Sequence, residues 1–283
     1  MITSGVSALE ANKFAIINSL LFVLTFYLIP KRYSILGRDN PKVIKFRLIC
    51  TLLVGLTSII LGYYKALELG LFSRFESKWS SYKALFKLLG FQIPNLVYTL
   101  KPLYLTVIVY LGNLLELYFM NQLPFQAHFY WKFDFVNVIL SWIGFRNYIW
   151  GPFIEELVFR SCNMLLFQFT NLSTFKKVSL TALYFGLAHV HHGFELYRKG
   201  EPINKILIIT AFQFSFTSLF GSYCSFSLLK TKSVYGPILS HIFCNVMGLP
   251  TLPDETLSKS RRQLIISIQL ISLPLFIISL IYL

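Results

Sequence analysis

Three groups of polar residues interrupt apolar stretches of this sequence, and their side chains are of types that catalyse hydrolysis. The polar residues of these groups are Glu155, Glu156, Arg160, His189, His241 and Asn245. A charged side chain in the middle of a bilayer costs roughly 2.5–3.5 kcal/mol on insertion scales, so charges inside apolar helices indicate a function. A carboxylate and a histidine activate water, and a His/Asn pair stabilises an oxyanion. The three groups together therefore predict a hydrolytic site in apolar surroundings.

Helical spacing distinguishes the two adjacent glutamates. Glu156 and Arg160 are four residues apart, so they share a helix face and can form an ion pair. Glu155 lies about 100° around the helix and lacks that partner. Gly151-Pro152 precedes both glutamates and favours a helix start there, where the helix dipole stabilises negative charge. We predict Glu155 as the general base and the Glu156–Arg160 pair as its support; a purely structural ion-pair cluster is the alternative.

The other two groups supply histidines and an amide at the same helical spacing. Phe185 and His189 share a face, and His189 is the candidate that shares the proton of a water held by Glu155. His241 and Asn245 project from one face of another helix, and both donate hydrogen bonds, as an oxyanion requires. An interhelical hydrogen-bonded pair is the structural alternative for these two.

A metal site is weighed and not predicted. His189, His192 and Glu195 approximate a ligand spacing, but the sequence contains no H-E-x-x-H. His191, His192 and Glu195 lie nearer a predicted helix end, where an interfacial role is favoured. We therefore predict no metal ligands and no cofactor.

A serine or cysteine nucleophile is the other alternative to an activated water. Ser161, Cys162 and Ser240 are close to the polar groups, but none lies in a G-x-S-x-G motif. Water activated by a glutamate is the simpler prediction.

Composition predicts an all-α polytopic membrane protein. Hydrophobic residues make up 55% of the 283 residues and charged residues only 13%, against about 25% charged in soluble domains; the mean hydropathy is +0.62. We predict one integral membrane domain over 1–283, with the catalytic motifs within 147–250. A span needs about 20 apolar residues, and about eight segments qualify, some of them short or interrupted. They are 13–30, 46–67, 97–119, 149–170, 178–196, 203–229, 234–250 and 263–283.

Further elements complete the predicted architecture. The helix that starts at Gly236-Pro237 ends near Gly248, about 16 Å later at 1.5 Å per residue. A helix so short predicts a partial span that lines a polar cavity. The stretches 71–96 and 123–147 are amphipathic or aromatic-rich and are predicted to lie in the membrane interface.

The net charge of +14 does not indicate a nucleic-acid partner, because the basic residues fall in loops between apolar runs. Loop charges of this kind orient a membrane protein and contact anionic lipid headgroups. Membrane lipid is therefore the predicted contact, and the orientation in the membrane is left open.

In order and spacing, the motifs resemble the type II CAAX endopeptidases (Ras-converting enzymes) of the ABI/CPBP family of intramembrane glutamate proteases. The resemblance depends on E-E-x-x-x-R at 155–160, F-x-x-x-H at 185–189 and H-x-x-x-N at 241–245. One of these motifs alone is weak, but all three in this order on a chain of about eight spans are specific.

The resemblance implies a fold, a reaction and a location. The fold is eight transmembrane helices that enclose a polar cavity, with Glu155 and His189 activating water and His241 with Asn245 stabilising the oxyanion. The implied reaction removes the last three residues of farnesylated or geranylgeranylated CAAX proteins, such as Ras-type small GTPases. The implied location is the endoplasmic reticulum membrane, as a multi-pass protein, and no cofactor is implied.

Three other functions are compatible with parts of the sequence. A non-catalytic scaffold of the same fold has no need of the complete catalytic set, and a protease of another membrane substrate would keep it. A proton-coupled transporter would use the Glu and His residues as a relay, but transporters often contain internal repeats and we find none.

Overall fold

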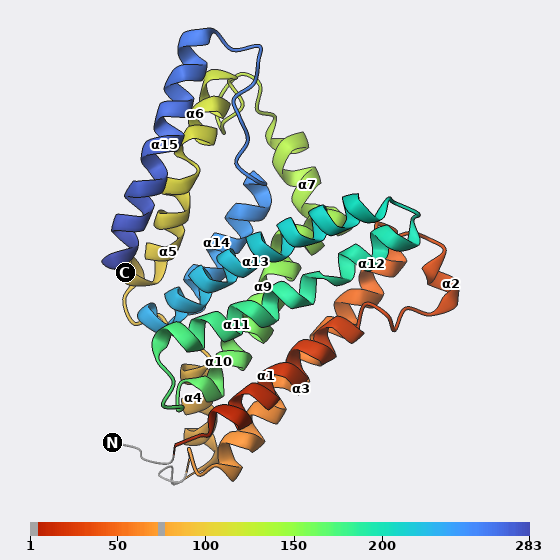
Figure 1. The fold of residues 1–283 in the computed structure, drawn as a ribbon, viewed down its shortest axis with the longest axis vertical. Coiled ribbons are helices and arrows are strands. Elements are labelled where there is room, and N and C mark those ends of the chain that lie inside the picture. The colour runs from red at the N-terminus through yellow and green to blue at the C-terminus, as the bar shows by residue number, and fades with distance from the viewer. Residues whose placement is uncertain (1–4, 73–76) are drawn as a thin grey trace. The chain divides into compact units, whose positions relative to one another are not determined.

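The computed structural model describes residues 5–72 and 77–283, and all regular secondary structure in that part is helical (Figure 1). The prediction of an all-α chain is confirmed. The chain divides into two compact units, each built from two separate stretches. The first unit comprises Met1–Pro94 and Phe153–Val234, and the second comprises Asn95–Pro152 and Tyr235–Leu283. The single membrane domain over 1–283 stays a prediction.

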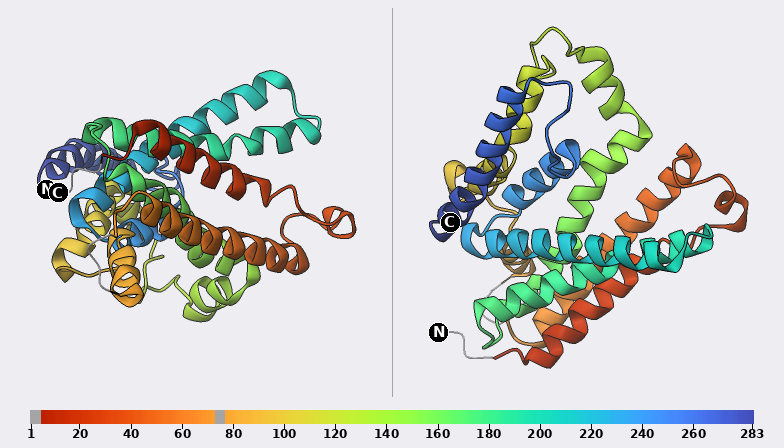
Figure 2. Two further views of the ribbon diagram at one scale, coloured as in Figure 1. Left: turned by 90° about the horizontal axis from the view of Figure 1, so that it is seen from below. Right: turned by 45° about the horizontal axis from the view of Figure 1, so that its top comes forward.

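The first unit carries most of the predicted site residues. Its long helices α11 and α13 run side by side, and α1 packs against α3, α10 and α11 (Figures 1 and 2). The short helix α9 (Gly151–Glu155) leads into it. Its helices are α1 (Ala8–Leu24), α2 (Lys31–Ser34), α3 (Pro41–Glu68), α4 (Lys78–Leu88), the π-helical segment η3 (Glu156–Cys162), α10 (Asn163–Phe167), α11 (Thr174–His189), α12 (His191–Arg198) and α13 (Ile203–Thr231).

Local sequence signals explain how α11 is placed. Ser173 caps its first turn by accepting a hydrogen bond from the Lys176 amide. At Gly186 the helix approaches α13 so closely that an added Cβ would collide with the Ser218 hydroxyl. A buried hydrogen bond of 2.9 Å joins Thr181 to Ser225 on α13 nearby. These contacts fix α11 and therefore its last residue, His189.

The centre of the first unit is the segment that follows the two glutamates. All residues of η3 and α10 are buried, which is unusual for a segment that contains Glu and Arg. Asn163 in this segment is hydrogen-bonded to Asn18 and Ser19 of α1, both at 3.2 Å. The polar residues of α1 thus hold it against the core.

The second unit is organised around α5 (Leu96–Val109). This helix packs against α14 and α15, and α15 also packs against α6 (Figure 1). The Tyr110 hydroxyl donates a hydrogen bond of 2.7 Å to the Gly248 carbonyl and so ties the end of α14 to the α5–α6 junction. The remaining elements are α6 (Leu111–Phe119), the π-helical segments η1 (Trp131–Val136) and η2 (Phe145–Trp150), α7 (Asn137–Leu140), α8 (Trp142–Gly144), α14 (Tyr235–Met247) and α15 (Lys259–Ile281).

Membrane spans are supported by the length and composition of the helices. Within the described ranges, α3, α13 and α15 are each long and apolar enough to cross a bilayer. The pair α5 and α6, bent by 62°, would make a fourth span if counted as one. Each of the eight predicted segments overlaps a helix, and α14 has 13 residues, consistent with the predicted short helix. Eight spans and an enclosed polar cavity stay predictions.

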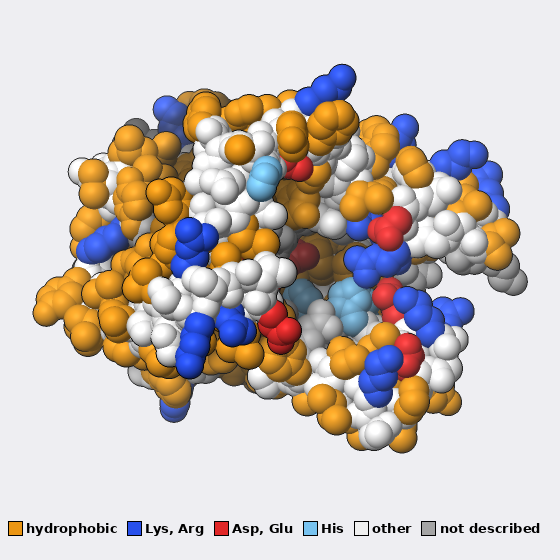
Figure 3. Space-filling view, turned by 90° about the horizontal axis from the view of Figure 1, so that it is seen from above, with side chains coloured by type: hydrophobic (Ala, Val, Ile, Leu, Met, Phe, Trp, Pro, Cys, Tyr) orange, Lys and Arg blue, Asp and Glu red, His pale blue; other side chains and the backbone are white. Residues whose placement is uncertain are grey.

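The two stretches predicted to lie in the interface differ in structure. Within 71–96, α4 is amphipathic, with Ser81 and Leu85 buried and Trp79 exposed; residues 73–76 of that stretch, Arg74 and Phe75 among them, lie outside the described part. The stretch 123–147 forms short helical segments with exposed aromatic side chains such as Phe133. Figure 3 shows hydrophobic side chains over much of the face that it presents, as expected of a protein surrounded by lipid.

Candidate active site

Glu156 and Arg160 form the predicted ion pair. The Arg160 Nε lies 3.1 Å from the Glu156 Oε2, and the two side chains are 1% and 0% exposed. Removing one partner of a buried pair leaves an uncompensated charge and costs roughly 3–5 kcal/mol. The two residues are therefore interdependent, and neither is accessible to bulk water.

Arg160 also lies over the ring of Phe185 on α11. Its guanidinium carbon is 3.8 Å from the centre of that ring and 5.8 Å from the ring of Phe220 on α13. A cation over an aromatic face is stabilised by the ring quadrupole, more strongly where water is excluded. Arg160 thus joins the glutamate helix to both α11 and α13.

Phe185 continues this contact to the candidate catalytic histidine. The ring of Phe185 meets the His189 ring edge-on, with centres 4.6 Å apart and planes at 71°. The sequence indicated that Phe185 and His189 share a face. It gave no sign that Arg160 also packs on the Phe185 ring. A continuous set of contacts therefore runs from Glu156 through Arg160 and Phe185 to His189.

The orientation of His189 follows from a backbone contact. Its Nδ1 lies 2.8 Å from the Phe185 carbonyl oxygen, so the tautomer that satisfies this contact carries the proton on Nδ1. That tautomer leaves Nε2 as the nitrogen that accepts a proton. The half-buried ring is thus arranged as a base would be.

Glu155 and Glu156 differ in exposure in the way that separate roles require. Glu155, the last residue of α9, is partly accessible, whereas Glu156 begins η3 and is fully buried. A general base must contact the water that it deprotonates. The difference supports Glu155 as the residue that meets water. α11, which carries His189, packs against η3 directly after Glu155.

His241 and Asn245 lie on α14 in the second unit, four residues apart as predicted. His241 is buried and Asn245 is exposed. The Asn245 side-chain amide donates a hydrogen bond of 2.9 Å to the Asn147 carbonyl, which orients the amide. The structure thus brings Glu155, Glu156, Arg160, Phe185 and His189 into the first unit, and His241 with Asn245 into the second.

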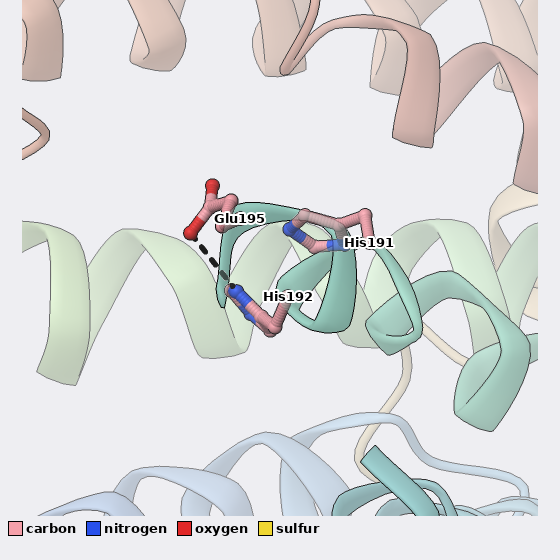
Figure 4. A group of neighbouring side chains, drawn as sticks. All are labelled: His191, His192 and Glu195. Atoms are coloured by element: carbon pink, nitrogen blue, oxygen red, sulfur yellow. Dashed lines mark hydrogen bonds and ion pairs between the residues drawn. The ribbon is translucent and has the colours of Figure 1, made fainter. Parts of the chain in front are cut away.

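A second histidine group begins directly after α11. His191, His192 and Glu195 lie in the first turns of α12, and the His192 Nδ1 is 3.5 Å from a Glu195 carboxylate oxygen (Figure 4). The sequence placed these residues at a helix end, where α12 indeed begins, and weighed His189 rather than His191 with the other two. All three lie on α12, where His191 and Glu195 are four residues apart and His192 and Glu195 are three apart, so helical spacing could have found the group.

Comparison with known proteins gives the family. The family model described as "Type II CAAX prenyl endopeptidase Rce1-like" matches residues 137–247. The chain is 33% identical to CAAX prenyl protease 2 of Homo sapiens over 245 residues, which cover 82% of the chain and 69% of that relative. The chain belongs to the type II CAAX prenyl endopeptidase family.

Other members of the family agree with this assignment. The probable CAAX prenyl protease 2 of Schizosaccharomyces pombe is 28% identical over 264 residues, covering 90% of the chain and 87% of the relative. The Saccharomyces cerevisiae CAAX prenyl protease 2 is 36% identical over 125 residues, which cover 41% of the chain and 39% of that relative. No solved structure matches the chain.

The region that matches the CAAX endopeptidase model contains all seven predicted site residues. They are Glu155, Glu156, Arg160, Phe185, His189, His241 and Asn245. The predicted family is confirmed. The individual roles of these residues stay predictions, since the comparisons name an activity and no mechanism.

Proposed function

We propose that this chain is an intramembrane endopeptidase that removes the C-terminal tripeptide from prenylated CAAX proteins. Membership of the CAAX prenyl endopeptidase family carries the proposal. The contacts that run from the buried Glu156–Arg160 pair to His189 support it, because they order a histidine on α11, which packs against the segment that directly follows the partly accessible Glu155.

In the proposed mechanism, Glu155 and His189 activate one water molecule. The water loses a proton to this pair as its oxygen forms a bond to the scissile carbonyl carbon. The carbonyl oxygen becomes an oxyanion, to which His241 and Asn245 donate hydrogen bonds. Collapse of the intermediate breaks the C–N bond, and the proton held by the pair passes to the departing amine of the tripeptide. No metal or other cofactor takes part in this scheme.

The substrate and the membrane explain why such a site lies among apolar helices. Each buried methylene of a lipid chain contributes about 0.8 kcal/mol, so a prenyl group stays in lipid while its short peptide tail reaches a polar cavity. The proposal includes eight spans around that cavity and a multi-pass location in the endoplasmic reticulum membrane. Farnesylated and geranylgeranylated proteins, such as Ras-type small GTPases, are the proposed substrates.

Two alternative functions of the same fold make different predictions. A non-catalytic scaffold would bind a partner and release no peptide. A protease of another membrane substrate would cleave a polypeptide without a prenyl group. The buried Glu156–Arg160 pair is compatible with all three functions, so peptide release is the property that distinguishes them.

The test uses the purified chain in detergent with a farnesylated Cys-a-a-X peptide and a matched peptide that lacks the farnesyl group. We expect release of the terminal tripeptide from the farnesylated peptide alone, measured by mass spectrometry. Release from both peptides would favour the broader protease. No release by a well-folded protein would leave the scaffold as the function.

A further inference from the structure

Three metal-ligand side chains meet at the start of α12. His191, His192 and Glu195 each present one ligand atom, and these atoms all lie within 4.8 Å of one another. Figure 4 shows the two imidazoles and the carboxylate at the same end of the helix. All three side chains are half-buried, so an ion from solvent can reach them. Within the described part of the chain, this is the one such group of three.

The donor set selects the kind of ion. Two imidazoles and one carboxylate suit zinc and related transition metals, whereas Mg²⁺ and Ca²⁺ prefer oxygen ligands alone. Zinc bonds of about 2.0–2.2 Å place neighbouring donors of a tetrahedral site about 3.4 Å apart. The present donors lie within 4.8 Å of one another, so binding requires them to approach by about 1.4 Å at most. Three protein ligands leave the fourth position for water.

The surroundings of His191 are those of a metal ligand. Its Nδ1 lies 2.6 Å from the Ala188 carbonyl oxygen, so this nitrogen donates to the backbone and Nε2 keeps its lone pair. Metal-binding histidines commonly donate their second ring N–H to a backbone carbonyl in this way. The ring also stacks on Phe26, just beyond the end of α1, with centres 4.7 Å apart, which fixes its plane.

The contact between His192 and Glu195 is compatible with an ion between them. The His192 Nδ1 lies 3.5 Å from the Glu195 carboxylate oxygen. This is longer than the roughly 2.7–3.2 Å of a typical N–H···O hydrogen bond, so the two groups are not held tightly to each other. The ring centres of His191 and His192 are 4.0 Å apart, so the two imidazoles lie next to each other. A cation there would stabilise all three groups together.

We propose that His191, His192 and Glu195 bind one divalent transition-metal ion of the zinc class. The ion joins the three side chains within the first turns of α12. It thereby stabilises the start of α12, next to the junction at Val190 where α11 ends at His189. It takes no part in hydrolysis, because neither Glu155 nor His189 is among its ligands. The proposal depends on the geometry of this group and is independent of the proposed peptidase activity.

Direct binding tests the site without relying on activity. Untagged protein in detergent is freed of metal by a chelator, and Zn²⁺ is then titrated by calorimetry. We expect one Zn²⁺ per chain. His192→Gln and Glu195→Gln should each weaken binding by at least about tenfold. The matched control is His128→Gln, because the His128 Nδ1 also contacts a backbone oxygen, that of Met120, but His128 is not part of the group.

Two further measurements separate metal binding from damage to the fold. All variants should melt at the wild-type temperature without metal, and Zn²⁺ should slow hydrogen exchange of α12 amides in wild type and His128→Gln only. A large excess of Mg²⁺ should not displace Zn²⁺. The proposal is overturned if the wild type takes up no Zn²⁺, or if both Glu195→Gln and His192→Gln bind it as wild type does. Tripeptide release should persist in the chelated protein. Release that is lost on chelation and restored by Zn²⁺ would contradict the proposal that the ion takes no part in hydrolysis, whereas release that is absent with and without Zn²⁺ would count against the peptidase mechanism alone.

Discussion

Phe185 is the residue through which the buried ion pair is predicted to act on His189, the proposed catalytic histidine. Its side chain is 1% exposed and contacts the Arg160 guanidinium and the His189 ring. Phe185→Leu keeps an apolar side chain there but removes the aromatic face. The loss comprises a desolvated cation–π contact of about 2 kcal/mol and two edge-on ring contacts, with His189 and Phe159, of about 0.5–1.5 kcal/mol each. We therefore expect about 3–5 kcal/mol of destabilisation.

The matched control is Phe159→Leu. Phe159 is also fully buried and forms two edge-on contacts, with Phe22 at 5.1 Å and with Phe185 at 5.2 Å. Its loss should cost about 1–3 kcal/mol in aromatic contacts. Phe159→Leu removes neither the Arg160–Phe185 contact nor the Phe185–His189 contact, so it is the milder change and should affect His189 less.

The assay compares kcat for tripeptide release with the melting temperature of each variant. A histidine displaced by about 1 Å loses up to roughly 100-fold in rate, so we expect kcat of Phe185→Leu to fall by about 10-fold to 100-fold. Phe159→Leu should keep kcat within a few fold at a temperature where both variants are folded. Equal losses of kcat in the two variants, or none in Phe185→Leu, would refute the positioning role.

Three further changes test separate parts of the structure. Arg160→Met should destabilise the protein by roughly 3–5 kcal/mol because Glu156 keeps a buried charge; the Glu156→Gln/Arg160→Met double variant should recover part of the melting temperature, and no recovery would argue against the pair. Asn245→Ala should lower kcat by about 100-fold to 1,000-fold with little change in KM if its amide binds the oxyanion, and an unchanged kcat would remove it from the mechanism. Gly186→Ala should lower the melting temperature, because its Cβ collides with the Ser218 hydroxyl; the Gly186→Ala/Ser218→Ala double variant should restore much of the loss, whereas no restoration would show that the strain lies elsewhere.

The features that sequence spacing predicts correctly are those set within one helix. The Glu156–Arg160 pair and the shared face of Phe185 and His189 follow from a separation of four residues, and both are present. The all-α class follows in the same way from composition and long apolar runs. Such relations need no knowledge of how helices pack.

The features that the sequence does not reveal depend on contacts between helices or on irregular backbone. Arg160 packs on Phe185 because α11 lies against η3, and no local pattern encodes that approach. The π-helical geometry of η3 likewise changes the residue spacing within a segment that reads as an ordinary helix. The break between α11 and α12 was also not predicted: the sequence indicates one segment over 178–196, whereas α11 ends at His189 and α12 begins at His191.

The predicted number of spans, about eight, exceeds the three or four that helix length and composition support among the described residues. Hydropathy marks eight segments, but several of them are divided between short helices, such as the run through α9, η3 and α10. The charged and polar residues of that run, the candidate base among them, lower its mean hydropathy. A functional site therefore weakens the very signal by which a span is recognised.

The most direct test of the account is tripeptide release by Glu155→Gln, with Glu68→Gln as the control. Glu68 is an exposed carboxylate of the same unit, paired with Lys65 at the surface, so its neutralisation should not change the rate. Loss of a general base lowers rates by about 100-fold to 10,000-fold, and we expect kcat of Glu155→Gln to fall by that amount with an unchanged melting temperature. If folded Glu155→Gln releases the tripeptide at the rate of wild type and Glu68→Gln, Glu155 is not the base and the proposed mechanism is wrong.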